Sequence, residues 1–460
     1  MSTSPRSSIE DSDRKYVFHP FTALRQHETS GGRMIVRGKD STLWDAQGNR
    51  YLDAMAGLWC VNVGYGRTEI AEAVAAQIER LSYYHGFSSM ATDTPALLAE
   101  RVLALSPVPM SKVFFGNSGS DANDTQAKLI WFYNNALGRP EKKKLIARTR
   151  GYHGVTVLAA GLTGLASLHD GFDLPLPMIR HARAPHRLWE AREGATDAEF
   201  VRLLADDLEA LILREGPETV AAFIAEPIQA AGGVIVPPEG YFAAIQEVLR
   251  RHDVLLIADE VVCGFGRLGS WFGSELLGIE PDLITVAKGI TSAYYPLSAC
   301  LVSERIWSVL ADGSSASVFA HGYTYSAHPV GAAAALANLD LLERERLVER
   351  AGERGERLQA RLHAAFDDLP IVGEVRGRGL LGAVEFLESR SPPRAFERSR
   401  GIGARVAARC LERGLITRAL PASDTIAFSP PFVVSEDELD EMVGLAREAA
   451  DEVAAGLGHE

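Results

Sequence analysis

The chain has few cysteines and lacks the long apolar runs of a membrane protein. Its four cysteines, Cys60, Cys263, Cys300 and Cys410, lie far apart and form no C-x-x-C pair, so we expect reduced thiols, no disulfide framework and no metal site. No run approaches the roughly 18 apolar residues that span a bilayer. The first 15 residues are polar and lack the apolar core of a signal peptide. We therefore expect a cytoplasmic protein with a mobile N-terminal tip.

Basic residues are fewer than acidic residues. The chain has 47 lysines and arginines against 60 aspartates and glutamates, a formal net charge of −13. Nucleic acids and anionic membranes require a basic face, so neither is expected as the main partner and a small molecule is favoured. The 460 residues are 47% hydrophobic, enough for two packed cores.

Short apolar runs alternate with helical stretches between about residues 110 and 330. The runs are residues 112–116, 144–148, 221–227, 254–260 and 283–289. This alternation predicts an α/β domain whose mainly parallel sheet is covered by helices on both faces. Ligands bind at the carboxyl ends of such strands. The polar residues there are Asn117–Ser120, Tyr152–His153, Glu226, Asp259 and Lys288.

The two ends of the chain predict a smaller α+β domain. Residues 34–54 alternate around a turn, as in a β-hairpin. After residue 330 we expect, in order, a helix at 331–366, strands at 371–377 and 380–386, a helix at 399–413, strands at 415–420 and 425–430, and a final helix. We therefore divide the chain into an N-terminal segment of the smaller domain (1–60), a large domain (61–330) and the rest of the smaller domain (331–460).

The segment Asn117-Ser-Gly-Ser-Asp121 lies between a predicted strand and a predicted helix. A glycine-containing turn at a helix N-terminus presents free N–H groups and a positive dipole end, which suit a phosphate. Ser118 and Ser120 add hydroxyl donors. Taken alone, the segment is more typical of an N-cap that binds no ligand, because such turns are common.

Two charged residues end predicted strands. An ionised Asp259 needs a partner, and a protonated ring nitrogen would serve, as would a structural salt bridge. Burial of Lys288 would lower its pKa and make it a nucleophile able to form a Schiff base. The alternative is a lysine that reaches solvent past the strand end.

Tyr152 and His153 follow another strand. Tyr152 offers a face for stacking on a planar ring, and His153 offers a base, although both residues are more often structural. Together the four signals describe a ligand with a phosphate, a basic ring nitrogen, an aldehyde and an aromatic face. Pyridoxal phosphate has all four.

The order NSGSDAND, RGYHG, AEPI, ADEVVCGFGRLG, TVAKG, HGYTYSAHP resembles the class III aminotransferases of pyridoxal-phosphate fold type I, from about residue 15 to 455. The ω-amine:pyruvate branch is the most similar. The resemblance implies that Lys288 forms the Schiff base and that Asp259 binds the ring nitrogen. It also implies a cofactor site completed by Ser118, Gly119, Ser120, Tyr152, His153, Glu226 and Val261. Tyr152 and Val261 would cover the two ring faces, Glu226 would orient the Asp259 region, and Thr324 would complete the phosphate site of the neighbouring subunit of a homodimer.

Two positions depart from the family pattern. Asp121 stands where the family usually has glutamate, and Tyr295 where this branch often has glutamine. We expect neither to touch the chemistry.

A transaminase accepts an amine and a keto acid in one pocket. The expected walls are apolar or aromatic: Phe21, Leu58, Trp59, Phe87, Tyr152, Ala231 and Val262. Ordinary core packing is the alternative for the aromatic residues. Arg418 matches the arginine that in this branch binds a carboxylate, for which a guanidinium is suited by its bidentate fork; its alternative is a surface salt bridge.

We therefore expect transfer of an amino group from an amine or ω-amino acid to pyruvate, giving alanine and an aldehyde or ketone. The competing hypotheses are another reaction of the same family, such as an aminomutase or decarboxylase, and a non-catalytic binding protein with this fold.

Overall fold

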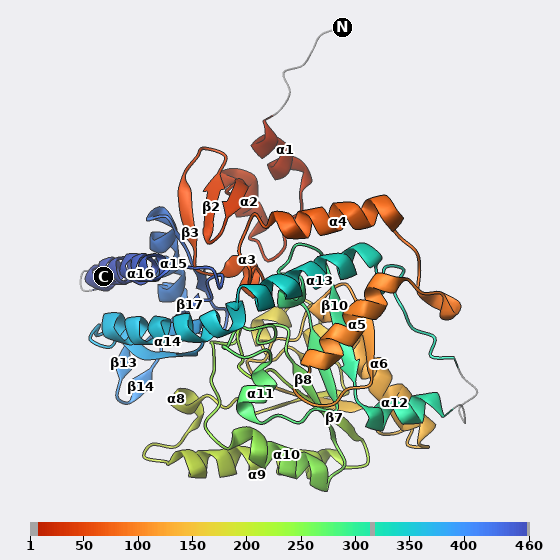
Figure 1. The fold of residues 1–460 in the computed structure, drawn as a ribbon. Helices are drawn as coiled ribbons and strands as arrows, with labels where there is room; N and C mark the ends of the chain where they lie inside the picture. Colours follow the sequence, from red (N-terminus) through yellow and green to blue (C-terminus); the bar gives the residue numbers. More distant parts are fainter. Residues whose placement is uncertain (1–7, 313–317, 458–460) are drawn as a thin grey trace.

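The computed structural model describes residues 8–312 and 318–457, and a seven-stranded sheet forms its centre (Figure 1). Its order is β4 (Lys112–Gly116), β10 (Ser298–Val302), β9 (Leu283–Val286), β8 (Leu255–Asp259), β7 (Val220–Ala225), β5 (Lys144–Arg148) and β6 (Ile179–Ala182). Strand β10 runs antiparallel to both of its neighbours, and the other strands run parallel to one another.

All five predicted runs are strands of this sheet. Strands β6 and β10 were not predicted. Strand β6 has four residues, two of which are Arg180 and His181, and β10 is five residues long. Strand β10 lies between β4 and β9 and is antiparallel to both, so β4 and β9 run in the same direction. The carboxyl ends of the five predicted strands therefore lie at one edge of the sheet.

Alternate residues of the strands face two different cores, because side chains of a strand alternate between its faces. Leu256 and Ala258 belong to one core, and Leu255 and Ile257 to the other. The first core contains residues of α4 (Thr68–Leu81), α5 (Asp93–Leu105), α9 (Asp197–Glu215), α10 (Tyr241–Arg251) and α13 (Pro329–Arg344). The second contains residues of α6 (Gly119–Ala136), α7 (Val157–Leu162) and α12 (Glu304–Ala311). The predicted sheet with helices on both faces is confirmed.

The two ends of the chain meet in a four-stranded sheet, in the order β1 (Ile35–Lys39), β2 (Thr42–Asp45), β3 (Arg50–Asp53) and β15 (Leu415–Ile416). Leu52 and Leu415 lie opposite each other in its parallel pair. A second four-stranded sheet has the order β11 (Val372–Arg378), β12 (Leu381–Phe386), β17 (Thr425–Phe428) and β16 (Arg418–Ala419). A smaller unit is thus built from both ends of the chain, whereas the predicted boundaries at residues 60 and 330 stay predictions.

Three predicted elements were wrong in detail. The hairpin at 34–54 is three strands. The predicted helix 331–366 is two helices, α13 and α14 (Leu347–Phe366), because the chain turns at Arg346, whose φ of 51° is left-handed. The predicted strand 415–420 is split between the two small sheets, since β15 pairs with β3 and β16 pairs with β17.

The remaining elements are mostly helices and short turns. They are α1 (Ile9–Tyr16), α2 (Leu24–Ser30), α3 (Ala56–Trp59), α8 (Arg187–Glu190), α11 (Gly273–Leu277), α15 (Ile402–Glu412), α16 (Glu436–Leu457), the pair β13 (Ser389–Arg390) and β14 (Pro393–Arg394), and four 3₁₀ turns at Phe87–Ser89, Ala166–Leu168, Lys288–Ile290 and Arg398–Arg400. Part of the predicted mobile tip is helix α1, and residues 1–7 lie outside the described residues. Within the described ranges, no helix is both long and apolar enough to cross a membrane.

Candidate active site

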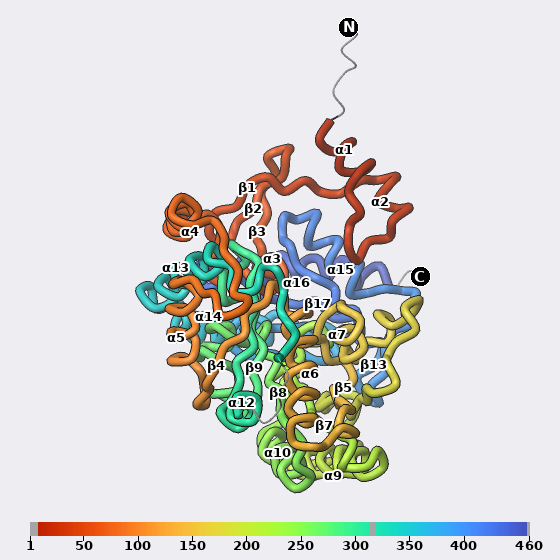
Figure 2. The backbone as a smooth tube through the Cα atoms, turned by 90° about the vertical axis from the view of Figure 1, so that its right-hand side faces the viewer, coloured from red at the N-terminus to blue at the C-terminus, as the bar shows by residue number. Residues whose placement is uncertain are grey.

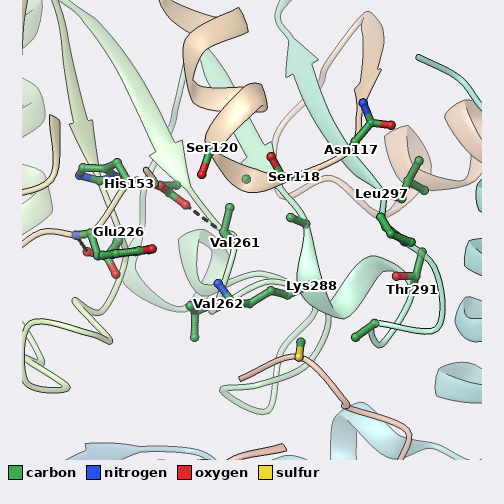
Figure 3. A pocket seen from close by; sticks show the side chains of 18 of the residues that line it. Asn117, Ser118, Ser120, His153, Glu226, Val261, Val262, Lys288, Thr291 and Leu297 are labelled. Atoms are coloured by element: carbon green, nitrogen blue, oxygen red, sulfur yellow. Dashed lines mark hydrogen bonds and ion pairs between the residues drawn. The ribbon is translucent and has the colours of Figure 1, made fainter. Parts of the chain in front are cut away.

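A cavity of about 350 Å³ opens at the carboxyl edge of the large sheet (Figure 3). The residues predicted to bind a cofactor line it, except Thr324: Ser118, Gly119, Ser120, Tyr152, His153, Glu226, Asp259, Val261 and Lys288. Figure 3 shows Ser118 and Ser120 at the start of α6, on the opposite side of the cavity from Lys288 and Val262. Residues from distant parts of the sequence therefore share one site.

The start of α6 is built to hold an anion. Ser118 is the N-cap, and its hydroxyl and the carboxylate of Asp121 form a capping box. Asp121 also accepts the N–H groups of Asn117 and Ser118, at 3.0 and 3.1 Å. The N–H groups of Gly119 and Ser120, in contrast, have no acceptor among the described residues. Two free N–H groups at the positive end of an 18-residue helix suit a phosphate.

Gly119 is required by its close approach to Val261. A Cβ atom at Gly119 would lie 3.0 Å from a methyl carbon of Val261. Because the glycine has no side chain, Val261 can lie directly below the helix start and form part of the cavity wall.

Asp259 is 2% exposed, and neighbouring residues hold its carboxylate in place. Its Oδ2 lies 2.8 Å from Nδ1 of His153 and accepts a hydrogen bond of 2.9 Å from the Asn123 amide. Among the described residues, the one donor to its Oδ1 is the N–H of Val261, at 3.1 Å, so this oxygen keeps capacity for a further donor. Asn123 was not predicted, because its place on the inner face of α6 is indistinguishable in sequence from a core position.

Lys288 follows β9 and has an amine without a fixed partner. No hydrogen bond or ion pair joins its Nζ to another described residue. Burial lowers the pKa of Lys288, although Cys60, Asp259 and Glu226 act in the opposite direction. Its φ of 43° is rare for a residue with a side chain and is maintained where the surrounding structure dictates it. The result is an amine positioned and deprotonated more readily than a surface lysine.

Glu226 supports the loop that carries Tyr152. Its two carboxylate oxygens accept the N–H groups of Tyr152 and Ala230, each at 3.0 Å. Burial raises the pKa of Glu226. It therefore holds the backbone beside His153, the residue that contacts Asp259, so the expectation that it orients the Asp259 region stays a prediction.

A second cavity of about 160 Å³ shares Tyr152, Glu226, Val262 and Lys288 with the first. Six of the seven predicted substrate walls line it: Phe21, Leu58, Trp59, Tyr152, Ala231 and Val262. Leu165, Leu168 and Pro421 also line it and were not predicted, because nothing in their local sequence distinguishes them from other loop residues.

Arg418 lines this second cavity from β16. Its guanidinium lies 5.2 Å from the ring centroid of Trp59 and forms no ion pair with a described residue. Burial lowers the pKa of Arg418. The alternative of a surface salt bridge is therefore wrong.

Phe87 lies elsewhere than expected, whereas the positions of Thr324 and Tyr295 contradict no expectation. Phe87 is 46% exposed and contacts Gly322, outside both cavities. Thr324 is exposed, and its carbonyl oxygen accepts a hydrogen bond of 2.6 Å from the Tyr83 hydroxyl, so its expected place at the neighbouring subunit's phosphate site stays a prediction. Tyr295 lines the first cavity, and the expectation that it does not touch the chemistry stays a prediction.

Comparison with known proteins decides the family. The family model for class III aminotransferases matches residues 24–449. The chain belongs to the class III aminotransferases. It is 52% identical to an uncharacterized aminotransferase of Sinorhizobium fredii, over 97% of this chain and 96% of the relative. It is 50% identical to a diaminobutyrate–2-oxoglutarate transaminase of Halomonas elongata, over 98% and 97%. Its fold matches the ω-transaminase of Pseudomonas jessenii in complex with PMP, with a TM-score of 0.96 and 44% identity over 98% and 99% of the chains.

Class III aminotransferases use pyridoxal phosphate, and the cavity of this one fits that cofactor. The free N–H groups of Gly119 and Ser120 match the phosphate, the spare acceptor capacity of Asp259 matches a protonated ring nitrogen, and the unpaired amine of Lys288 matches an aldehyde. The volume of about 350 Å³ is within the range of small-molecule sites. The fold class, the cofactor and the enzyme class expected from the sequence are confirmed.

Proposed function

We propose that this aminotransferase transfers the amino group of an amine or ω-amino acid to pyruvate, giving alanine and an aldehyde or ketone. Pyridoxal phosphate supplies the electron sink for this chemistry when it is bound. In our proposal Lys288 holds the cofactor and moves the proton at the reacting carbon, while Asp259 keeps the ring nitrogen protonated. Ser118, Gly119 and Ser120 bind the phosphate, and Tyr152 and Val261 enclose the ring.

The observation that carries the choice of acceptor is the charge of the second cavity. Among the described residues that line it, the cationic ones are Lys288 and Arg418. If Lys288 is occupied with the cofactor, one guanidinium is left for one carboxylate. A keto acid with a single carboxylate, such as pyruvate, fits this arrangement, whereas the second carboxylate of 2-oxoglutarate would be desolvated without a partner. The Halomonas elongata relative is named for 2-oxoglutarate, so this acceptor is the comparison that the assay must include.

The walls favour donors with an apolar or uncharged substituent next to the amine. Phe21, Leu58, Trp59 and Ala231 surround the cavity with apolar surface. Arg418 lies over Trp59 without an ion pair, so an apolar substituent would require no buried ion pair to be broken. An ω-amino acid would instead present its own carboxylate to Arg418.

A half-reaction assay of Arg418→Ala tests the proposal. Loss of a charge-assisted contact in a partly desolvated pocket should reduce kcat/KM for pyruvate by about 30- to 1,000-fold, or roughly 2–4 kcal/mol. The half-reaction with an uncharged aryl amine should change far less. Each is measured by single-turnover absorbance, starting from the matching cofactor form. Arg398→Ala is the control, because Arg398 lines a different cavity and should leave both rates unchanged.

Three outcomes would contradict the proposal. Equal losses in both half-reactions would show that Arg418 supports the fold or the cofactor. If wild type turned over faster with 2-oxoglutarate than with pyruvate, 2-oxoglutarate would be the preferred amino acceptor. Absence of any keto-acid-dependent amino transfer, with rearranged or decarboxylated products instead, would favour the aminomutase or decarboxylase hypothesis.

We also propose a homodimer in which Thr324 of each chain completes the phosphate site of the other. The support is a surface beside Thr324 that carries large apolar side chains in the single chain. Tyr84, Phe87, Met90 and Tyr325 are 42–59% exposed there. Tyr83 links the two segments of this patch through its contacts with Thr324 and Tyr325. Exposed patches of this kind are typical of subunit interfaces.

We place the enzyme in the cytoplasm. All four cysteines are unpaired, as expected where thiols stay reduced. Fractionation of cells expressing the tagged protein tests this placement, and recovery outside the cytoplasm would contradict it.

A further inference from the structure

Three metal-binding side chains converge at the N-terminal end of the molecule, outside both cavities. Asp13 lies on α1, His27 on α2, and His19 in the connection between them. Figures 1 and 2 show the two helices beside each other at the edge of the smaller unit. One ligand atom of each residue lies within 4.8 Å of the other two.

Both imidazoles direct Nε2 at the same carboxylate. His19 Nε2 lies 3.0 Å from Asp13 Oδ2, and His27 Nε2 lies 3.6 Å from that same oxygen. The two rings are close, with centroids 4.2 Å apart. One carboxylate oxygen therefore stands between two ring nitrogens.

Hydrogen bonding accounts for His19 but not for His27. His19 Nε2 is within hydrogen-bonding distance of both Asp13 oxygens. The side chain of His27 is only 10% exposed, and its Nε2 is buried with no hydrogen-bond partner among the described residues. Buried polar nitrogens are rarely left unpaired in this way. A buried nitrogen that faces a carboxylate at 3.6 Å without a hydrogen bond points to a missing ligand between the two.

We propose that Asp13, His19 and His27 bind one divalent transition-metal ion, for which zinc fits best. Zinc bonds of about 2.0–2.2 Å in a tetrahedral arrangement put neighbouring ligand atoms about 3.3–3.5 Å apart. The observed 3.0 and 3.6 Å lie on either side of this spacing, and the third separation is within 4.8 Å. Two imidazoles and a carboxylate are the ligands of a zinc site with three protein ligands, and water takes the fourth position.

The ion would tie α1 to α2 and thereby hold the segment between them. That segment includes Phe21, which lines the substrate cavity. Metal binding to a preformed ligand set stabilises the fold that presents it. The site thus has a structural role, and its existence does not depend on the proposed acceptor or donor.

Zinc uptake by the holoenzyme tests the site directly. The protein is treated with a chelator, dialysed, and titrated with zinc sulfate in competition with a chromophoric chelator. Wild type should take up one zinc ion tightly per chain, and His27→Gln and Asp13→Asn should each bind it at least about 100-fold more weakly. His363→Gln is the matched control, because His363 forms an exposed pair with Asp367 at 3.1 Å that lacks a second histidine. Equal uptake by wild type and the two ligand variants, or no tight zinc in wild type, would overturn the proposal.

The rate of trypsin cleavage is a second test, because zinc would not change this rate if His27 had only a packing role. Lys15 and Arg25 are exposed within the two helices. Zinc should slow cleavage after these residues at least about tenfold in wild type and leave the rate in His27→Gln unchanged, as followed by mass spectrometry. Cleavage of wild type that is equally fast with and without zinc would overturn the tie between α1 and α2.

Discussion

Asp259 illustrates how a residue gains its role from neighbours that are remote in sequence. His153 and Asn123 both bind its Oδ2, and Thr285 in turn donates to Asn123 Oδ1 at 2.8 Å. These contacts fix the carboxylate and leave Oδ1 with spare acceptor capacity. In the proposed function, the negative charge of Asp259 is the property that acts on the ring nitrogen.

Replacement of that charge should slow catalysis without unfolding the protein. Asp259→Asn retains the size of the side chain but no longer stabilises a protonated ring nitrogen, so we expect turnover to fall by on the order of 10²-fold or more. Steady-state alanine formation measures the loss. Asp282→Asn is the control, because Asp282 accepts the Leu256 N–H at 2.9 Å, at the start of β8 instead of its carboxyl end. Turnover of Asp259→Asn at the wild-type rate would show that Asp259 is structural.

Glu260, the next residue, is a buried carboxyl that responds to pH. Burial raises its pKa from 4.5 to about 7, although the N–H groups of Gly273 and Ser274 and the Ser274 hydroxyl bind it. The folded state therefore keeps a proton that the unfolded chain releases above pH 4.5. Its contribution to stability is complete below pH 4.5 and is lost as pH rises through 7.

Glu260→Gln should remove this dependence. Between pH 5 and 8, the free energy of unfolding of wild type should fall relative to that of the variant by on the order of 2–3 kcal/mol. Urea denaturation of both proteins at several pH values measures the difference. Parallel pH profiles for the two proteins would mean that Glu260 does not titrate in this range.

At the scale of elements, the site depends on close packing between the loop after β5 and the first turn of α6. Gly154 has a φ of 133°, and a Cβ atom there would lie 2.7 Å from Cα of Ser120. The Ser120 hydroxyl accepts the N–H of Val155 at 3.1 Å. The absence of a side chain at Gly154 thus sets the distance between the loop that carries Tyr152 and the turn at Ser118–Ser120, which we propose binds the phosphate.

Gly154→Ala should push these two elements apart. We expect a loss of about 1–3 kcal/mol in stability and measurable release of the cofactor on dialysis, because the helix start would shift from the phosphate. Thermal denaturation and absorbance of the dialysed enzyme measure the two effects. Gly138→Ala is the control, since Gly138 also has a positive φ of 71° but no atom within 4 Å of an added Cβ. If Gly138→Ala released the cofactor equally, backbone strain and not the packing at Ser120 would be the cause.

At the scale of the whole molecule, cofactor retention should depend on assembly. Tyr325→Asp would place a charge in the exposed apolar patch beside Thr324, and we expect the dimer to dissociate and the enzyme to lose its cofactor more readily. Light scattering and dialysis measure mass and retention. Leu213→Asp is the control, because Leu213 is 57% exposed on α9, away from the patch. A wild type with the mass of one chain would contradict the homodimer.

The sequence by itself determined the fold class and the residues at the strand ends. Apolar periodicity is a local property, and parallel strands bring their carboxyl ends to one edge whatever their order, so Ser118, Asp259 and Lys288 could be assigned to one site without coordinates. The sequence did not predict β10, because the antiparallel direction of this strand depends on its pairing with β4 and β9.

Only the tertiary structure decided the contacts between segments that are distant along the chain. It places Asn123 on Asp259, Arg418 over Trp59, and Phe87 outside the substrate cavity. It also brings Asp13, His19 and His27 together, although cysteine spacing had led us to expect no metal site. Each of these contacts depends on how helices and sheets pack, and packing is a sum over many weak contacts that no local pattern contains.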